Sequence, residues 1–292
     1  MANLKEVRNR ITSVSSTQQI TSAMKMVSAA KLRRAQDAIV QMRPYAGKLK
    51  EILENLSAGL DSSDGIYSKQ REVKNVLIIV ITSNRGLCGG FNANVIKAAN
   101  RLMKEQYSGC KVSVLAIGKK GTDFFKKTEH GIVGTDMPRG LNELFEDLSY
   151  ANVAPVAEKI MSLFVDAQFD KIEMVYNQFK NAAVQITTVE QFLPVQTPKS
   201  DKKSKTTDYI FEPNIEYIVA DIIPRSLKTQ LFKALLDSHA AEHGARMTSM
   251  HKATDNAGAL IKELKLMYNK ARQAAITNEI LEIVGGAEAL NG

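Results

Sequence analysis

The feature that most constrains this chain is a run near its end, residues 225–290, that contains no proline and only four glycines. Apolar or small side chains recur there in steps of three and four, which is the spacing of a coiled-coil seam. A helix of this length spans on the order of 90–100 Å at 1.5 Å per residue, so it needs a partner along its length. The seam positions are Ala257, Leu260, Leu264, Met267, Ala271, Ala274 and Leu281, with Asn278 in the remaining slot.

The predicted partner is the other end of the chain. From Asn3 to Leu56 the first glycine is Gly47, and Pro44 is the one proline. We expect the two ends to form a long antiparallel coiled coil, the alternative being two separate amphipathic helices on a globular body. The predicted seam positions at this end are Leu4, Val7, Ile11, Val14, Ile20, Met24, Val27, Ala35, Ile39, Met42, Ala46, Leu49, Leu53 and Leu56.

Between the two ends the pattern becomes that of alternating strands and helices, which predicts an α/β layer domain. The run 76–82 is continuously apolar and β-branched, as expected for a strand buried on both faces. The other predicted strands are 111–118, 171–177, 183–193, which also suits an antiparallel strand, and the edge piece 209–211; a short apolar piece lies at 132–133. The predicted helices are 93–105, 122–127 and 152–168.

The predicted fold class is therefore α/β, with a Rossmann-like domain inserted between the two halves of one coiled coil. A helical stretch opens at Asn214, and Pro224 either kinks this stretch or begins the final helix. The predicted domains are an N-terminal helix at 1–58, the α/β domain at 73–213 and a C-terminal helix at 214–292.

Charge is concentrated in the N-terminal helix. Residues 1–57 hold ten Lys or Arg and four Asp or Glu, so their net charge of +6 (10 − 4) is most of the chain's +8. A basic helix suits an acidic partner, and charge alone allows nucleic acid, anionic lipid or an acidic protein surface. There is no run of eighteen apolar residues and no apolar signal core at the N-terminus. Cys88 and Cys110 lack metal-ligand or redox spacing, which fits a reducing compartment.

Two groups of residues have types and positions that can support binding or catalysis elsewhere. The glycine loop 85–92 follows the first strand, where a nucleotide binds in doubly wound domains, but it matches neither G-x-G-x-x-G nor the phosphate loop. A tight turn with close backbone packing is the better interpretation. His239 and His243 are one turn apart without a third ligand, which favours a solvated helix face over a zinc site. We predict no active site, metal or cofactor.

A denser polar signal lies in the C-terminal helix between Tyr268 and Glu279. Gln273 and Thr277 are one turn apart and share a face, with Arg272 nearby. Alanines beside these groups would let a partner's backbone approach closely. The segment is equally compatible with a contact site and with an ordinary wet helix face.

Several blocks of this sequence resemble the gamma subunit of rotary F-type ATP synthase. The resemblance covers the whole chain, is strongest at both ends and is weaker from 121 to 204. The blocks are Leu4–Ile11, Thr17–Val27, Arg85–Asn92, Glu242 with Ala245–Met247, Ala253–Ala257, and Tyr268–Glu279 followed by Gly286 and Ala287.

The resemblance implies a non-catalytic rotor subunit. Its coiled coil would stand in a ring of alternating alpha and beta subunits, with the α/β domain at the foot beside the epsilon subunit and on the c-ring. It would transmit torque so that proton or sodium flow drives ATP synthesis, with nucleotides bound by the ring subunits and no cofactor here. The implied location is the cytoplasmic side of the bacterial inner membrane, where the chain would be a peripheral protein held through the complex only. Nucleic acid is not an implied partner.

The resemblance also assigns contact residues position by position. Arg272, Gln273 and Thr277 match residues that contact the beta-subunit catch loops, and Glu279 belongs to the same motif. Met24 and Lys25 match the neck that faces an acidic segment of beta. The matches to the foot on the c-ring are Tyr209, Phe211 and Glu212.

Two features depart from the expected pattern. Gly244 stands where a better helix former is expected, which would soften the helix by up to about 1 kcal/mol. The loop 199–207 is strongly basic and has no assigned role. Two rival functions remain at this stage: a nucleic-acid-binding coiled coil, against which the sparse aromatics argue, and a nucleotide-dependent enzyme built on the α/β domain.

Overall fold

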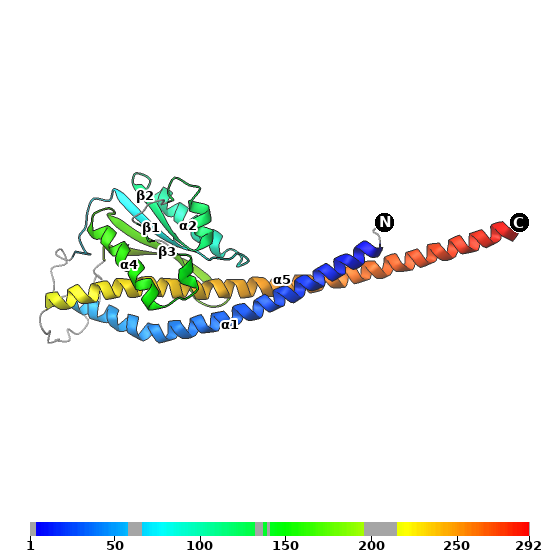
Figure 1. Ribbon diagram of the computed structural model, residues 1–292, viewed down its shortest axis with the longest axis horizontal. Coiled ribbons are helices and arrows are strands. Elements are labelled where there is room, and N and C mark those ends of the chain that lie inside the picture. Colours follow the sequence, from blue (N-terminus) through cyan, green and yellow to red (C-terminus); the bar gives the residue numbers. More distant parts are fainter. Residues whose placement is uncertain (1–3, 58–65, 132–136, 139–140, 196–214, 292) are drawn as a thin grey trace. The chain divides into compact units, whose positions relative to one another are not determined.

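The computed structural model describes residues 4–57, 66–131, 137–138, 141–195 and 215–291 (Figure 1). They form two compact units, Ala29–Arg246 and Met1–Ser28 with Met247–Gly292, which are described in turn. Both long helices run through both units. In chain order the elements are α1 (Leu4–Ser57), β1 (Asn75–Ile81), α2 (Phe91–Gln106), β2 (Lys111–Ile117), α3 (Lys119–Phe125), the 3-10 turn η1 (Glu143–Phe145), α4 (Tyr150–Val165), β3 (Lys171–Phe179), β4 (Gln185–Leu193) and α5 (Ile215–Asn291).

The unit 29–246 is built on one four-stranded sheet in the order β2-β1-β3-β4. The strands β1 and β2 pair in parallel, as do β1 and β3, whereas β4 runs antiparallel to β3. In β1, every side chain from Val76 to Ile81 is fully buried, as its continuous β-branched run predicts for a central parallel strand. The predicted α/β class and the antiparallel last strand are confirmed.

Helices cover both faces of this sheet, and alternate residues of β1 point into two separate cores. Val76, Ile78 and Val80 pack with α2, whose apolar stripe supplies Val95 and Ala99. The opposite core is larger and is shared by α4 and α5. It gathers Leu77, Ile79, Ile81, Ile160, Phe164, Leu227, Leu231 and Leu235, among others. The sheet is therefore the middle layer of three, and this part of α5 is built into the domain (Figure 1).

In the other unit, α1 and α5 lie antiparallel. Three cross-helix approaches fix the register: Arg8 meets the Tyr268 hydroxyl, the Gln18 amide lies over Gly258, and the Thr21 and Thr254 hydroxyls are 2.8 Å apart. The residue numbers of each pair add up to 275 or 276, as two helices running in opposite directions require. The predicted antiparallel pairing of the two ends is confirmed here.

Parts of the predicted seam on α1 are wrong. Ala35, Ile39, Leu49 and Val7 are buried as expected, but Ile20 and Val27 are 60% and 58% exposed. The residues buried in that stretch are Thr21 and Ser28, with Gln18 and Met24 half-buried. The buried positions keep the spacing of three and four residues, but several of them are polar. A pattern of apolar residues alone therefore does not reveal them.

The C-terminal seam is confirmed for Ala257 and Leu264, which are buried, and fails farther along. Met267 is 53% exposed and Leu281 is 63% exposed. Met267 faces outward within the paired stretch, whereas Leu281 lies beyond Arg272, the position opposite Leu4 (276 − 4), where the described α1 residues end. Every described side chain from 272 to 287 is exposed.

Several predicted boundaries also shift. The final helix begins at Ile215 and contains Pro224, so this proline does not begin it. The short helix expected at 122–127 is α3, three residues earlier, and the helix expected at 152–168 is α4. The pieces predicted at 132–133 and 209–211 lie outside the described residues. Within the part of the chain that is described, no helix is both long and apolar enough to cross a membrane.

Candidate functional site

The polar segment near the end of α5 presents its predicted contact residues to solvent. Arg272, Gln273, Thr277 and Glu279 are all exposed. The Thr277 hydroxyl donates to the backbone carbonyl of Gln273 at 3.0 Å, one turn back along the helix. Since this part of α5 lies beyond the described residues of α1, its hydrogen-bonding groups are available to another chain from most sides.

The predicted neck residues are in a different setting. Met24 and Lys25 are half-buried on α1, within the region where the two helices pair. By the register, Met24 lies opposite residue 252 of α5 (276 − 24). About 20 helical positions, or roughly 30 Å, separate that point from Arg272. The two predicted beta-contact clusters are therefore separate places along the helix pair and form no single site.

The predicted c-ring contacts, Tyr209, Phe211 and Glu212, lie outside the described residues. The basic loop at 199–207 does so too.

At the carboxyl end of β1, where doubly wound folds bind nucleotides, the loop 83–92 is hydrogen-bonded to the strand end and packed on α5. Asn92 accepts from the backbone N–H of Ser83 at 2.9 Å and donates to its hydroxyl at 2.8 Å, which ties the loop 83–92 to the strand end. Cys88 and Phe91 of this loop then pack on Ala241 and Ala245 of α5. The sequence-based interpretation of the glycine loop as a tight packing turn is confirmed.

Arg246 fastens this loop to α5; the sequence analysis included it in a block that resembles the family but gave it no role. Its Nη2 donates to the carbonyls of Arg85 and Gly86 at 3.0 and 3.3 Å, and its Nε donates to Gly86 at 3.4 Å. Its Nη1 donates to Oε1 of Glu242 at 2.6 Å and to Nδ1 of His243 at 3.4 Å. All five N–H groups of the guanidinium are thus directed at acceptors.

Burial shapes the titration of this cluster. It raises the pKa of Glu242 above its usual value, against the opposing effect of the Arg246 charge. Burial also raises the pKa of the Cys88 thiol. A thiol with a raised pKa inside a packed junction is a poor nucleophile, so Cys88 has a structural role in this loop.

Gly244 has a packing role that the sequence does not reveal. A Cβ at this position would lie 3.2 Å from both the Cα and the carbonyl oxygen of Ala182, in the turn between β3 and β4. The absent side chain lets that turn approach α5 closely. The predicted softening of the helix at Gly244 therefore misses its main effect, which is contact with the sheet.

His239 and His243 are not on a solvated helix face, as the sequence suggested. His243 is buried, and its Nε2 lies 3.1 Å from Nε2 of His239, whose ring stacks on Phe145. Burial, with help from nearby cations, lowers the pKa of His239 to about 4 and that of His243 to about 3. Within the described residues, no group of three or more His, Cys, Asp or Glu is placed to hold a metal.

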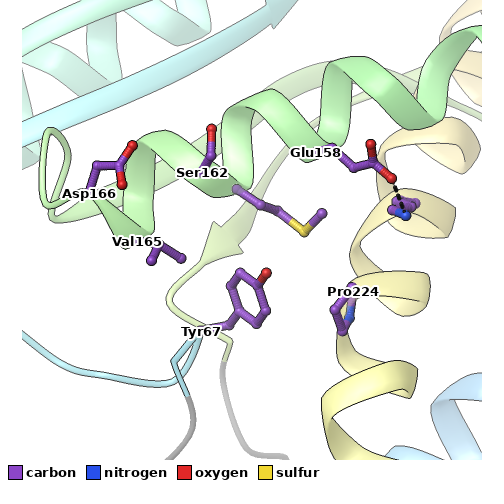
Figure 2. A pocket seen from close by; sticks show the side chains of 8 residues that line it. Tyr67, Glu158, Ser162, Val165, Asp166 and Pro224 are labelled. Atoms are coloured by element: carbon purple, nitrogen blue, oxygen red, sulfur yellow. Dashed lines mark ion pairs between the residues drawn. The ribbon is translucent and has the colours of Figure 1, made fainter.

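A pocket of about 410 Å³ lies between α4 and α5 (Figure 2). Its one cation, Lys228, is paired with Glu158 at 2.5 Å. No predicted contact residue lines it, and its side chains include no His or Cys. The lining residues are Tyr67, Glu158, Met161, Ser162, Val165, Asp166, Pro224 and Lys228.

Apolar surface marks two further places that the sequence analysis assigned differently. On α1, Ile20, Met26 and Val27 are exposed next to the half-buried Met24 and Lys25. The sequence analysis placed Ile20 and Val27 in the seam, but each lies one position before a buried residue, Thr21 or Ser28. At the end of α5, the exposed apolar side chains are Ile276, Ile280, Leu281, Ile283 and Val284. Apolar patches of this kind favour contact with other chains.

The model of the ATP synthase family matches residues 3–290 of this sequence. The ATP synthase gamma chain of Flavobacterium johnsoniae is 62% identical over the full length of both chains, and that of Chlorobaculum tepidum is 45% identical over 99% of both. The chain belongs to the ATP synthase gamma-chain family. This membership confirms the resemblance that the sequence motifs indicated.

Solved structures agree in fold with this gamma-chain family member. A chain of the Euglena gracilis mitochondrial ATP synthase aligns with a TM-score of 0.67 at 20% identity, covering 98% of this chain and 94% of that one. A chain of the Tetrahymena thermophila central stalk and c-ring aligns with a TM-score of 0.57 at 23% identity. Two long terminal helices around an α/β domain are therefore shared with stalk proteins despite low sequence identity.

Proposed function

We propose that this chain is the rotor of an F-type ATP synthase, transmitting torque between a membrane c-ring and a catalytic ring of alpha and beta subunits. The observation that carries the proposal is the full-length relation to ATP synthase gamma chains. The antiparallel helix pair supports it, because a two-stranded shaft resists bending and twisting better than one helix. Proton or sodium flow turns the shaft, and the catalytic sites belong to the other subunits.

Beta-subunit contacts fall at the two separated clusters. Arg272, Gln273, Thr277 and Glu279 hydrogen-bond to beta at and beyond the position where Leu4, the first described residue of α1, lies opposite α5. Met24 and Lys25, with the exposed apolar residues beside them, meet an acidic segment of beta lower on the shaft. The basic charge of residues 1–57 suits such a partner.

The foot carries the remaining contacts of the proposal. Tyr209, Phe211 and Glu212 face the polar loops of the c-ring, and the α/β domain lies beside the epsilon subunit. The chain is then held at the cytoplasmic side of the bacterial inner membrane through these partners. The proposed domains remain 1–58, 73–213 and 214–292.

Co-expression tests the assembly. A tagged form of this chain, produced with its own alpha and beta subunits, is expected to purify with a ring that hydrolyses ATP. Recovery of the chain alone, or bound to nucleic acid, would contradict the proposal. The chain by itself should give no saturable heat in calorimetric titration with ATP, and saturable heat would favour a nucleotide-dependent enzyme.

The contact cluster on α5 is tested by substitution. The double change Gln273→Ala and Thr277→Ala is expected to lower ATP hydrolysis of the assembled ring while leaving the chain's thermal unfolding unchanged. Glu282→Ala is the matched control, because nine positions along a helix place it on the side opposite Gln273. Equal effects of the two changes would argue against a specific contact face.

A further inference from the structure

The imidazoles of His239 and His243 form a hydrogen-bonded pair on α5, and Arg246 connects this pair to the loop 83–92. Arg246 donates to Nδ1 of His243, so this nitrogen carries no proton. The proton of His243 therefore sits on Nε2, which donates to Nε2 of His239 at 3.1 Å. Both rings are neutral, and their tautomers follow from the network.

Neither ring can take up a second proton without breaking a contact. Protonated His239 would direct an N–H at the N–H of His243. Protonated His243 would direct an N–H at the guanidinium of Arg246, which already holds a positive charge. Each event replaces a hydrogen bond with a repulsion between two donors.

Two cations disfavour a further positive charge on the histidine pair. Lys31 of α1 and Arg246 of α5 both act electrostatically against protonation of the two rings. The carboxylate of Glu242 is engaged by Arg246 at 2.6 Å and also feels Lys31 and Arg85. The loop adds the neutral Cys88 thiol, and η1 adds the uncharged ring of Phe145.

The pair is linked to the loop through one side chain. The guanidinium that donates to His243 is the same group that donates to the Arg85 and Gly86 carbonyls. We propose that His239, His243 and Arg246 form an acid-sensitive latch, in which protonation of the imidazole pair displaces Arg246 and releases the loop 83–92 from α5. At neutral pH the latch is closed.

The direction of the effect follows from linkage. The released state accepts protons near the ordinary histidine pKa of about 6.5, whereas the closed state resists them until much lower pH. Closure is therefore fully favoured above about pH 6.5 and is lost as the pH falls below it. Between pH 6 and pH 5 the opening equilibrium is expected to rise about 8-fold for each imidazole and roughly 60-fold for the pair.

Cys88 offers a direct readout, because its side chain is 2% exposed and packs on Ala241 and Ala245 in the same junction. The reaction of the full-length Cys110→Ser chain with 4,4′-dithiodipyridine is followed from pH 7 to pH 5. The rate for Cys88, divided by that of a small thiol at the same pH, is expected to rise between pH 6 and pH 5 by the factors given above. A ratio that stays flat over this range overturns the proposal.

Variants separate the latch from general acid unfolding. His243→Gln keeps an acceptor for Arg246 and cannot be protonated, so it is expected to leave about an 8-fold rise, and adding His239→Gln is expected to remove the rise. His251→Gln is the control, since His251 is exposed and pairs with Asp255. Should the double variant retain the full acid response, or should circular dichroism show that helicity is lost together with Cys88 protection, the latch does not exist.

Discussion

At the scale of single residues, Arg246 is the side chain on which most of the junction depends. It lies with Glu242 in an ion pair whose side chains are 8% and 10% exposed, and it holds two loop carbonyls. A buried pair adds little net stability over apolar residues, but removal of one partner leaves an uncompensated buried charge. The main effect of Arg246 on stability is therefore that its removal would leave Glu242 buried without a partner.

Arg246→Gln is expected to lower the free energy of unfolding by about 3–5 kcal/mol, since Glu242 then stays buried without its partner. The measurement is urea unfolding of the full chain. Arg101→Gln is the matched control, because the Arg101–Glu105 pair has the same i,i+4 spacing with side chains 74% and 60% exposed. Its removal should change stability little. Similar costs at both sites would contradict the assigned burial.

Two helical glycines give a second test at this scale. A Cβ at Gly47 meets nothing within 4 Å, so Gly47→Ala is expected to stabilise the chain by about 0.5–1 kcal/mol through helix propensity. Gly244→Ala should gain less or lose stability, because its Cβ meets the Ala182 backbone at 3.2 Å. Thermal unfolding of both variants checks the difference, and equal gains would show that the β3–β4 turn does not approach Gly244.

At the scale of elements, the helix pair is organised by a seam that mixes apolar and polar layers. Leu264 and Val7 are buried in it, and so is Thr21, whose hydroxyl meets that of Thr254. Met267, three positions from Leu264, is on the outside at 53% exposure. Within one helical turn, the burial of Leu264 therefore depends on the partner helix, whereas Met267 remains exposed.

Leu264→Asp is expected to destabilise the helix pair by several kcal/mol, because it places an unpaired charge in the seam. Met267→Asp is the control and should cost little. Helicity of the full chain against temperature measures both. In the assembled complex, Leu264→Asp is further expected to uncouple rotation from catalysis. Full ion-driven ATP synthesis with this change would show that the seam assignment is wrong.

The sequence predicted the elements well because their signals are local. The continuous run of β1 and the 3-4 rhythm of both long helices needed no tertiary information. The seam at Thr21 and Ser28 was missed since polar seam residues look like surface residues in a sequence. The joint made by Arg246 and Gly244 was missed for another reason: its partners, Gly86 and Ala182, are distant in the chain.

The candidate contact residues were predicted by family resemblance more than by physical pattern. Gln273 and Thr277 share a helix face by spacing alone, but spacing could not distinguish a contact site from a wet surface. Their exposure in the structure is compatible with both. What the structure adds is the register, which places them at and beyond the described start of α1.

At the scale of the whole molecule, folding and function draw on different parts of α5. Residues 227–235 belong to the core beneath the sheet, and residues up to about 271 pair with α1. From 272 to 287 every described side chain is exposed. This last part therefore contributes almost no buried area to the fold of the chain.

Removal of residues 273–292 is expected to leave the free energy of unfolding within about 0.5 kcal/mol of the intact chain, as for surface changes elsewhere. Urea unfolding of the truncated chain checks this. Under the proposed function, the same truncation should reduce the torque transmitted to the catalytic ring, since it deletes Gln273, Thr277 and Glu279. A large loss of stability would instead mean that the end of α5 folds back on the chain.

The unaccompanied end of α5 has a geometric consequence. Where two helices run together, each hides one side of the other, but a solitary helix shows its full circumference to its surroundings. At 100° per residue, the exposed Ile276, Ile280, Leu281, Ile283 and Val284 all lie within an arc of roughly 160°. A neighbour that contacts this end of α5 would therefore meet an apolar surface on one side of the helix and a more polar surface on the other.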